Sequence, residues 1–219
     1  MALLHDYRLS PLNGGPPKRA VIFLHGVGDR GDGGLLEIGR IWQPSFPDCE
    51  FLCPDAPFPF DGAPPEFGGR QWYSLQSFTP EKIYAGTREA ALHLNAYIDH
   101  ILTTRGFTSR QLALVGFSQG TIMALYTAPR RTEPVTCIVA YSGLLTGGET
   151  LAAEKKCAPP VLLVHGMIDE VVPFAAMGAA AQGLKAAGIP VSTITCPSLG
   201  HSIDDVGLIE GLKFLQKYL

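Results

Sequence analysis

Residues 111–120 read QLALVGFSQG, an apolar run that leads directly into a serine flanked by glycines. Gln111–Val115 has the length and composition of a buried β-strand, and a helical pattern begins shortly after Ser118. Gly116–Gly120 fits the G-x-S-x-G motif, in which a serine stands on a sharp strand-to-helix turn above the strand ends. This combination predicts an α/β fold and makes Ser118 a candidate nucleophile.

Short apolar runs on both sides of this motif predict further strands of the same sheet. The runs are apolar on both faces, which is typical of parallel strands covered by helices on each side. They lie at Ala20–Leu24, Phe51–Cys53, Val135–Tyr141, Val161–Val164 and Val191–Cys196. The sequence therefore predicts an open, mostly parallel sheet. Since no internal repeat or linker is visible, we expect one domain over residues 1–219.

The segments between these runs predict helices. Thr79 fits an N-cap and Pro80 a first helical position, so a long helix is expected from there to about Thr104. A shorter helix over Thr121–Ala128 is expected to end at Pro129. Two more are expected at Val172–Ala187 and Asp205–Leu219, the last with Val206, Ile209, Leu212 and Leu215 facing the core.

A long segment at about 54–79 breaks this pattern, because it predicts neither a strand nor a helix. Loops of this length inside a compact domain are usually functional or disordered. The segment is rich in proline and glycine, and its aromatic side chains argue against disorder because such side chains pack. These aromatic residues are Phe58, Phe60, Phe67, Trp72, Tyr73 and Phe78.

The composition excludes several classes of protein. Lys+Arg 17 against Asp+Glu 20 gives a net charge of −3 with no basic cluster, so nucleic-acid binding is not expected. The longest unbroken apolar runs are far shorter than the roughly 20 residues of a membrane span. The 5 cysteines form no C-x-x-C pair, and no secretory signal is visible, so we expect reduced thiols and a cytoplasmic protein. A bridge between Cys49 and Cys53 is the alternative.

A serine nucleophile needs a general base, and on such folds an acid and then the histidine follow the serine along the chain. Only His165 and His201 lie downstream of Ser118. His165 directly follows a strand and suits local packing, whereas His201 lies in a polar loop after the last strand, so His201 is the expected base. Asp169, just past the Val161–Val164 strand, is the expected acid, with Glu170 as the alternative. The remaining nearby carboxylates, Asp204 and Asp205, suit the start of the last helix.

The oxyanion formed in such a reaction needs two N–H donors. One is expected from the backbone of Gln119, at the start of the helix after the motif. The second is expected from Val27, in the glycine-rich loop that follows the first strong strand. His25 precedes Ser118 and is interpreted as a structural residue that braces this loop. The same loop fits G-x-G-x-x-G loosely, but the next strand leads into Pro54 without a suitable acid, which argues against dinucleotide binding.

Taken together, these motifs resemble the phospholipase/carboxylesterase family of α/β-hydrolases, which includes bacterial carboxylesterases and acyl-protein thioesterases. The resemblance covers nearly the whole chain and rests on HGVGD at 25–29, RQWYS at 70–74, GFSQG at 116–120, HGMIDEVVP at 165–173 and GH at 200–201. It implies Ser118, Asp169 and His201 as a catalytic triad, with the N–H groups of Val27 and Gln119 as the oxyanion hole.

The resemblance also implies that Arg70, Trp72 and Tyr73 lie beside the active site, where Trp72 is expected to form a wall of an acyl pocket. Two departures from the family are visible. Many members have leucine where this chain has Val27, and the 54–79 segment is longer and richer in phenylalanine than in the shortest members.

The expected reaction is hydrolysis of a short- to medium-chain carboxylic ester, or of a thioester, through an acyl-serine intermediate. A lysophospholipase or an acyl-protein thioesterase that removes palmitate is the alternative, and a non-catalytic binding protein of the same fold is a remote one. The expected partner is a small acyl ester or thioester, with no metal and no cofactor. Either a monomer or a homodimer is compatible with the sequence.

Overall fold

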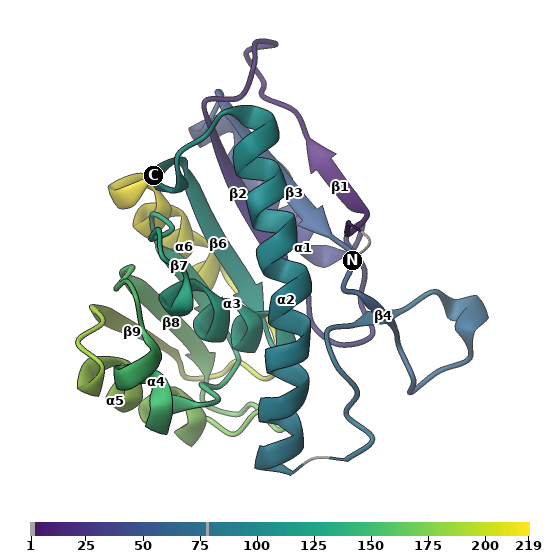
Figure 1. Ribbon diagram of the computed structural model, residues 1–219, viewed down its shortest axis with the longest axis vertical. Helices are drawn as coiled ribbons and strands as arrows, with labels where there is room; N and C mark the ends of the chain where they lie inside the picture. Colours follow the sequence, from purple (N-terminus) through teal and green to yellow (C-terminus); the bar gives the residue numbers. More distant parts are fainter. Residues whose placement is uncertain (1–2, 78) are drawn as a thin grey trace.

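A computed structural model describes residues 3–77 and 79–219 of the chain. Its core is one seven-stranded sheet in the order β1-β3-β2-β6-β7-β8-β9, parallel except for β1 (Figure 1). The strands span Asp6–Leu9 (β1), Arg19–Leu24 (β2), Cys49–Pro54 (β3), Leu112–Phe117 (β6), Ile138–Tyr141 (β7), Val161–Gly166 (β8) and Val191–Cys196 (β9). The mostly parallel sheet predicted from the sequence is therefore confirmed.

Two strands at the edges of the sheet differ from the prediction. β1 was not predicted, and it pairs with β3 in an antiparallel register that sets Asp6 against Pro54. β9 pairs only with β8, so Ser192 and Thr193 are exposed instead of being buried on both faces. The five central strands are buried along nearly their whole length, as expected for parallel strands between two layers of helices.

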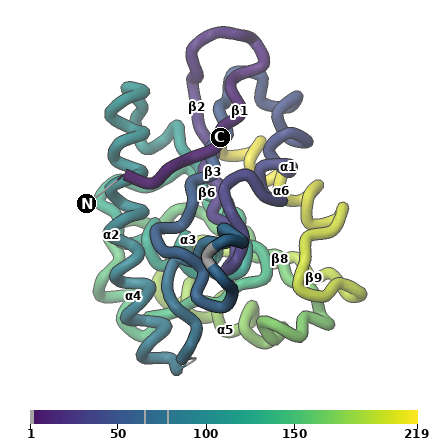
Figure 2. Tube along the Cα trace, turned by 90° about the vertical axis from the view of Figure 1, so that its right-hand side faces the viewer, coloured from purple at the N-terminus to yellow at the C-terminus, as the bar shows by residue number. Residues whose placement is uncertain are grey.

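Helices cover both faces of the sheet. The α-helices span Gly34–Trp42 (α1), Pro80–Arg105 (α2), Gln119–Arg130 (α3), Gly148–Glu154 (α4), Ala175–Ala186 (α5) and Asp205–Tyr218 (α6). Seen along the edge of the sheet, α2 and α4 lie on one side and α1 and α6 on the other (Figure 2). The buried apolar residues form two clusters accordingly, one between the sheet and α2, α3 and α5, the other between the sheet and α1 and α6.

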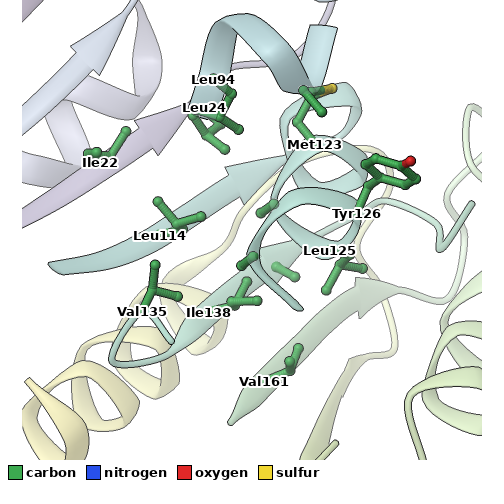
Figure 3. Packing of buried hydrophobic residues seen from close by; sticks show 14 of the residues in the cluster. Ile22, Leu24, Leu94, Leu114, Met123, Leu125, Tyr126, Val135, Ile138 and Val161 are labelled. Atoms are coloured by element: carbon green, nitrogen blue, oxygen red, sulfur yellow. The ribbon is translucent and has the colours of Figure 1, made fainter. Parts of the chain in front are cut away.

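The first cluster joins side chains that are far apart in the sequence. Leu24 of β2 and Leu94 of α2 lie close to Met123 of α3 (Figure 3). Leu114 and Ile138 extend the cluster across β6 and β7 beneath the same helix (Figure 3). Because burial of each large aliphatic side chain is worth about 1.5–3 kcal/mol, this cluster holds α3, and with it the turn at Ser118, firmly on the sheet.

Helix ends follow their sequence signals only in part. Thr79 caps α2 as expected, by accepting a hydrogen bond from the backbone N–H of Lys82 at 3.4 Å. The helix ends at Arg105, one residue past the expected Thr104, and is capped by Gly106 with a left-handed φ of 66°. The end expected for the next helix is wrong, because α3 continues through Pro129 to Arg130. Pro129 removes one backbone N–H donor from the last turn, and α3 ends one residue after it.

The inward face of α6 also differs from the prediction. Val206 and Ile209 are about half exposed, at 50% and 51% of their surface, whereas Gly207 and Gly211 are buried. The hydroxyl of Tyr141 donates a hydrogen bond to the carbonyl of Gly207 at 2.9 Å. A Cβ atom on Gly211 would overlap that same hydroxyl. The two glycines therefore let α6 approach β7, and this close approach turns the larger side chains outward.

The 54–79 segment contains more structure than predicted. Phe58–Pro59 (β4) and Arg70–Gln71 (β5) form a two-stranded antiparallel sheet, and Pro65–Phe67 is a single 3-10 turn (η2) between them. In Figure 1 this segment projects beside β1 and then returns to the start of α2. Phe78 lies outside the described residues. The segment is thus a folded excursion from the end of β3 toward the carboxyl edge of the sheet.

No helix among residues 3–77 and 79–219 is long and apolar enough to cross a lipid bilayer.

Candidate active site

The turn at Ser118 joins β6 to α3 with a strained backbone. Ser118 has φ 53° and ψ −117°, a conformation that residues with a side chain rarely adopt. Its N–H donates to the carbonyl of Tyr141 at 3.0 Å, which ties the turn to the neighbouring strand. A Cβ atom on Gly116 would lie 2.6 Å from the carbonyl oxygen of Gly120, and one on Gly120 would overlap the carbonyl of Leu24. Both glycines of the motif are therefore required for the chain to turn this closely.

Asp169 and His201 meet at the carboxyl edge of the sheet. Nδ1 of His201 lies 2.8 Å from Oδ2 of Asp169, whose side chain is fully buried. The other carboxylate oxygen accepts the N–H groups of Val171 at 2.9 Å and Val172 at 2.8 Å. Burial by itself would raise the pKa of Asp169, but the bonds from His201 and the backbone outweigh it and hold that pKa below its usual range. A charged Asp169 fixes the proton of His201 on Nδ1 and leaves Nε2 able to accept a proton.

His201 lies beside the turn at Ser118, because its ring packs next to that of Phe117. The centroids of the Phe117 and His201 rings lie 4.9 Å apart. Within the described residues no hydrogen bond joins the hydroxyl of Ser118 to His201. Hydrogen bonds between catalytic groups are often long without substrate and tighten when it binds. The geometry therefore brings the three residues of the expected triad to one edge and joins two of them directly.

The other candidate carboxylates lie elsewhere. Glu170 is exposed, next to the buried Asp169. Asp204 caps α6 by accepting the N–H of Gly207 at 2.8 Å, and Asp205 begins the helix. The roles that sequence reasoning gave to the last two residues agree with this arrangement.

His165 contacts the same carboxylate as His201. Its Nε2 lies 2.9 Å from the carbonyl of Val172 and 3.3 Å from Oδ2 of Asp169, and its ring is buried. Nε2 must carry the proton, because the carbonyl of Val172 only accepts hydrogen bonds. Sequence reasoning expected local packing and missed the contact with Asp169. The sequence signal for this contact is the spacing of the two residues. A side chain at the end of a strand can reach a residue four positions later, in the turn that follows.

Two backbone N–H groups at this edge are unpaired in the part of the chain that the structure describes, one at Val27 in the loop after β2 and one at Gln119, the first residue of α3. Within the described residues, neither the N–H of Val27 nor that of Gln119 takes part in a hydrogen bond. His25, fully buried, donates from Nδ1 to the carbonyl of Gly26 at 2.7 Å and accepts the N–H of Ala56 at Nε2 at 3.0 Å. Burial lowers the pKa of His25, and the neutral ring suits both contacts. His25 thus braces the loop as expected.

The strand β5 continues this bracing. The N–H of Gly28 donates to the carbonyl of Arg70 at 2.7 Å, and the N–H of Arg70 donates to the carbonyl of Asp29 at 3.0 Å. The guanidinium of Arg70 donates to the carbonyls of Ala56 and Pro57 at 2.9 and 2.8 Å. The backbone and the guanidinium of Arg70 are therefore both hydrogen-bonded to the backbone of other residues. This arrangement does not support the expected contact between Arg70 and substrate.

Trp72 also differs from the expected role. It has no exposed surface, so its side chain forms no wall that a substrate could contact, and Tyr73 is nearly buried at 3%. The indole N–H of Trp72 donates to the carbonyl of His25 at 3.0 Å. The side chain of Gln119 accepts the N–H of Trp72 and donates to the carbonyl of Tyr73, both at 2.8 Å. A buried indole needs a partner for its N–H, and here that partner fixes the loop that carries Val27. These contacts correct the expectation for Trp72, which braces the site instead of lining an acyl pocket.

The comparisons with known proteins agree with this architecture. A sequence profile described as Phospholipase/Carboxylesterase matches residues 12–219. The chain belongs to the phospholipase/carboxylesterase family. Esterase YpfH of Escherichia coli (strain K12) is 29% identical over 212 residues, which cover 97% of this chain and 88% of that protein. Acyl-protein thioesterase 1 homolog 1 of Dictyostelium discoideum is 29% identical over 205 residues, which cover 91% of this chain and 90% of that protein.

Solved structures of the family have the same fold. The crystal structure of esterase PE8 superposes with a TM-score of 0.93 at 36% identity and covers 100% of both chains. Acyl-protein thioesterase 2 of Zea mays has a TM-score of 0.70 at 25% identity, covering 97% of this chain and 98% of its own. The family is one of hydrolases, and the predicted α/β-hydrolase fold is confirmed.

Proposed function

We propose that the protein is a serine carboxylesterase that hydrolyses short- to medium-chain esters, and thioesters, within one domain. Ser118 attacks the acyl carbonyl while His201 takes the proton of its hydroxyl. Asp169 holds the ring of His201 and stabilises its protonated form. The N–H groups of Val27 and Gln119 bind the oxyanion. His201 then gives its proton to the leaving alcohol or thiol, and a water molecule repeats the cycle on the acyl-enzyme.

The observation that carries this proposal is the bond between His201 and Asp169. Its length is 2.8 Å, and the carboxylate has no exposed surface. A buried carboxylate of lowered pKa that also accepts two backbone N–H groups is suited to orient an imidazole and to stabilise its protonated form. The strained turn at Ser118 and the two unpaired N–H groups support the same reaction.

A fluorophosphonate probe tests the nucleophile directly. We expect labelling of the folded protein at Ser118, and no labelling of Ser118→Ala. Glu170 is the exposed chain neighbour of Asp169, so Glu170→Gln is the matched control for Asp169→Asn. Each of these two variants replaces one carboxylate by its amide, and only Asp169→Asn should lose labelling. A folded protein that the probe does not label would support a non-catalytic binding protein instead.

A second candidate function is that of an acyl-protein thioesterase or lysophospholipase. Two of the similar proteins are named acyl-protein thioesterases, which favours this candidate. The profile of kcat/KM on p-nitrophenyl esters from acetate to palmitate separates the two. A maximum at short or medium chains supports the carboxylesterase, and a steady rise to palmitate supports the alternative.

A further inference from the structure

A cavity of about 300 Å³ lies between α1, α6 and the end of β6. Its volume is near the lower end of the range of about 300–1,000 Å³ for small-molecule sites. Most of its surface is apolar and comes from Leu35 and Ile38 of α1, Phe117 of β6, and Ile203 and Leu208.

The cavity adjoins the reacting groups of the proposed mechanism. Two of its lining residues, Phe117 and Ser202, are the chain neighbours of Ser118 and His201. The ring of Phe117 lies 4.9 Å from that of His201. The same ring lies 3.3 Å from the position of a Cβ atom on Gly26, in the loop that carries Val27. Phe117 therefore borders the cavity and lies beside both His201 and the loop that carries Val27.

The reaction decides which part of a substrate can reach this place. His201 gives its proton to the leaving oxygen or sulfur, so the leaving group must lie on the His201 side of the acyl carbon. We propose that the cavity binds the alcohol part of the ester, and that this alcohol is compact, apolar and without negative charge. This inference rests on the proposed function and adds the class of its leaving group.

The charge of the cavity lining disfavours a negatively charged alcohol. Asp29 is its one ionisable side chain, and none of the lining residues is Lys, Arg or His. Oδ1 of Asp29 accepts the N–H of Arg30 at 2.8 Å, and the carboxylate lies against Gly33, the N-cap of α1. It therefore already balances the positive end of that helix. A phosphate, which the leaving alcohol of a lysophospholipid carries, would meet a carboxylate and no cation there.

Two acetate esters with different alcohols test this subsite, because both form the same acetyl-enzyme. Leu208→Trp fills the cavity from α6. We expect the ratio of kcat/KM for benzyl acetate to that for methyl acetate to fall by about 10–200-fold, the range for a change in fit in an apolar pocket. The hydrolysis rate of the shared acetyl-enzyme should not change, since the alcohol has left by then. The matched control is Leu145→Trp, in a separate cavity lined by Leu144, Leu145 and Tyr84, which should not change the ratio.

A measurement on the unchanged protein complements the variants. Acetyl-enzyme formed from p-nitrophenyl acetate should transfer its acetyl group to benzyl alcohol more readily than to glycerol 3-phosphate. Equal transfer to the two alcohols, an unchanged ester ratio in Leu208→Trp, or an equal change in Leu145→Trp would overturn the subsite. If any of these results occurs while Ser118→Ala loses all turnover, only the subsite is overturned and the proposed function stands. If Ser118→Ala still turns over the ester, the proposed function is overturned.

Discussion

The side chain of Gln119 connects the serine turn to the segment around Trp72, and replacing it tests whether this connection holds the site together. Methionine has nearly the same length and volume as glutamine, so Gln119→Met removes the two hydrogen bonds of the amide while filling the same space. Both bonds are 2.8 Å long, and Gln119 is 2% exposed. The variant leaves the N–H of Trp72 and the carbonyl of Tyr73 without their partners.

The magnitude follows from these two bonds. Each hydrogen bond contributes about 0.5–1.5 kcal/mol net, and each buried polar group left unpaired costs about 1–3 kcal/mol. Because two buried groups lose their partners, we expect Gln119→Met to lower the free energy of unfolding by about 2–6 kcal/mol. The turn at Ser118 also loses its hydrogen-bonded connection, through Trp72, to the loop that carries Val27. Since loss of a complete oxyanion donor costs about 10²–10³ in kcat, a loosened one should cost about 10–100-fold in kcat/KM.

Urea unfolding and hydrolysis of p-nitrophenyl acetate measure the two effects. Gln71→Met is the matched control, because Gln71 is also buried but its Oε1 has no partner within the described residues. Removing an unpaired buried group is nearly neutral or stabilising, so this control should lose no stability. A loss below about 0.5 kcal/mol in Gln119→Met, or an equal loss in both variants, would refute the reasoning.

Three further predictions concern the histidines and the acid. Asp169→Asn should lower kcat about 10⁴-fold in steady-state assays, by the precedent of other triads. Because the pKa of Asp169 is lowered in the folded protein, its contribution to stability is present above about pH 3.9 and is lost as pH falls through the lower folded pKa. The free energy of unfolding in urea should therefore depend less on pH below about 3.9 in Asp169→Asn than in the unchanged protein. His165→Asn should lose about 1–3 kcal/mol of stability in urea and lose activity, while His165→Gln, whose longer amide can place an N–H near Nε2, should restore both. The lowered pKa of His25 means that stability falls as pH drops below about 6.5, and NMR titration should find this ring still neutral at that pH.

The features that sequence reasoning predicted well are local. The turn at Ser118 depends on Gly116 and Gly120, which stand within two residues of it, and the cap of α2 depends on Thr79 and Pro80. Such signals act between chain neighbours, so the sequence alone displays them.

The features that it missed depend on distant partners. α1 begins at glycines without a capping side chain and is held by packing of Leu35 and Trp42 against the sheet. The role of Trp72 depends on the carbonyl of His25, which lies 47 residues away along the chain. A buried indole and a pocket wall have the same sequence signature, an aromatic residue in a loop near the site. Only the folded chain shows which carbonyl the indole meets.

The strained backbone of Ser118 has a consequence for how stability and activity can be improved together. A residue held at such a φ costs about 1–3 kcal/mol, and glycine avoids most of that cost. Ser118→Gly should therefore be at least as stable as the natural chain while having no nucleophile. A search for thermostable variants that does not also require turnover would favour this replacement. Stabilisation of the enzyme is better sought at the exposed positions of α6, which lie outside this trade-off.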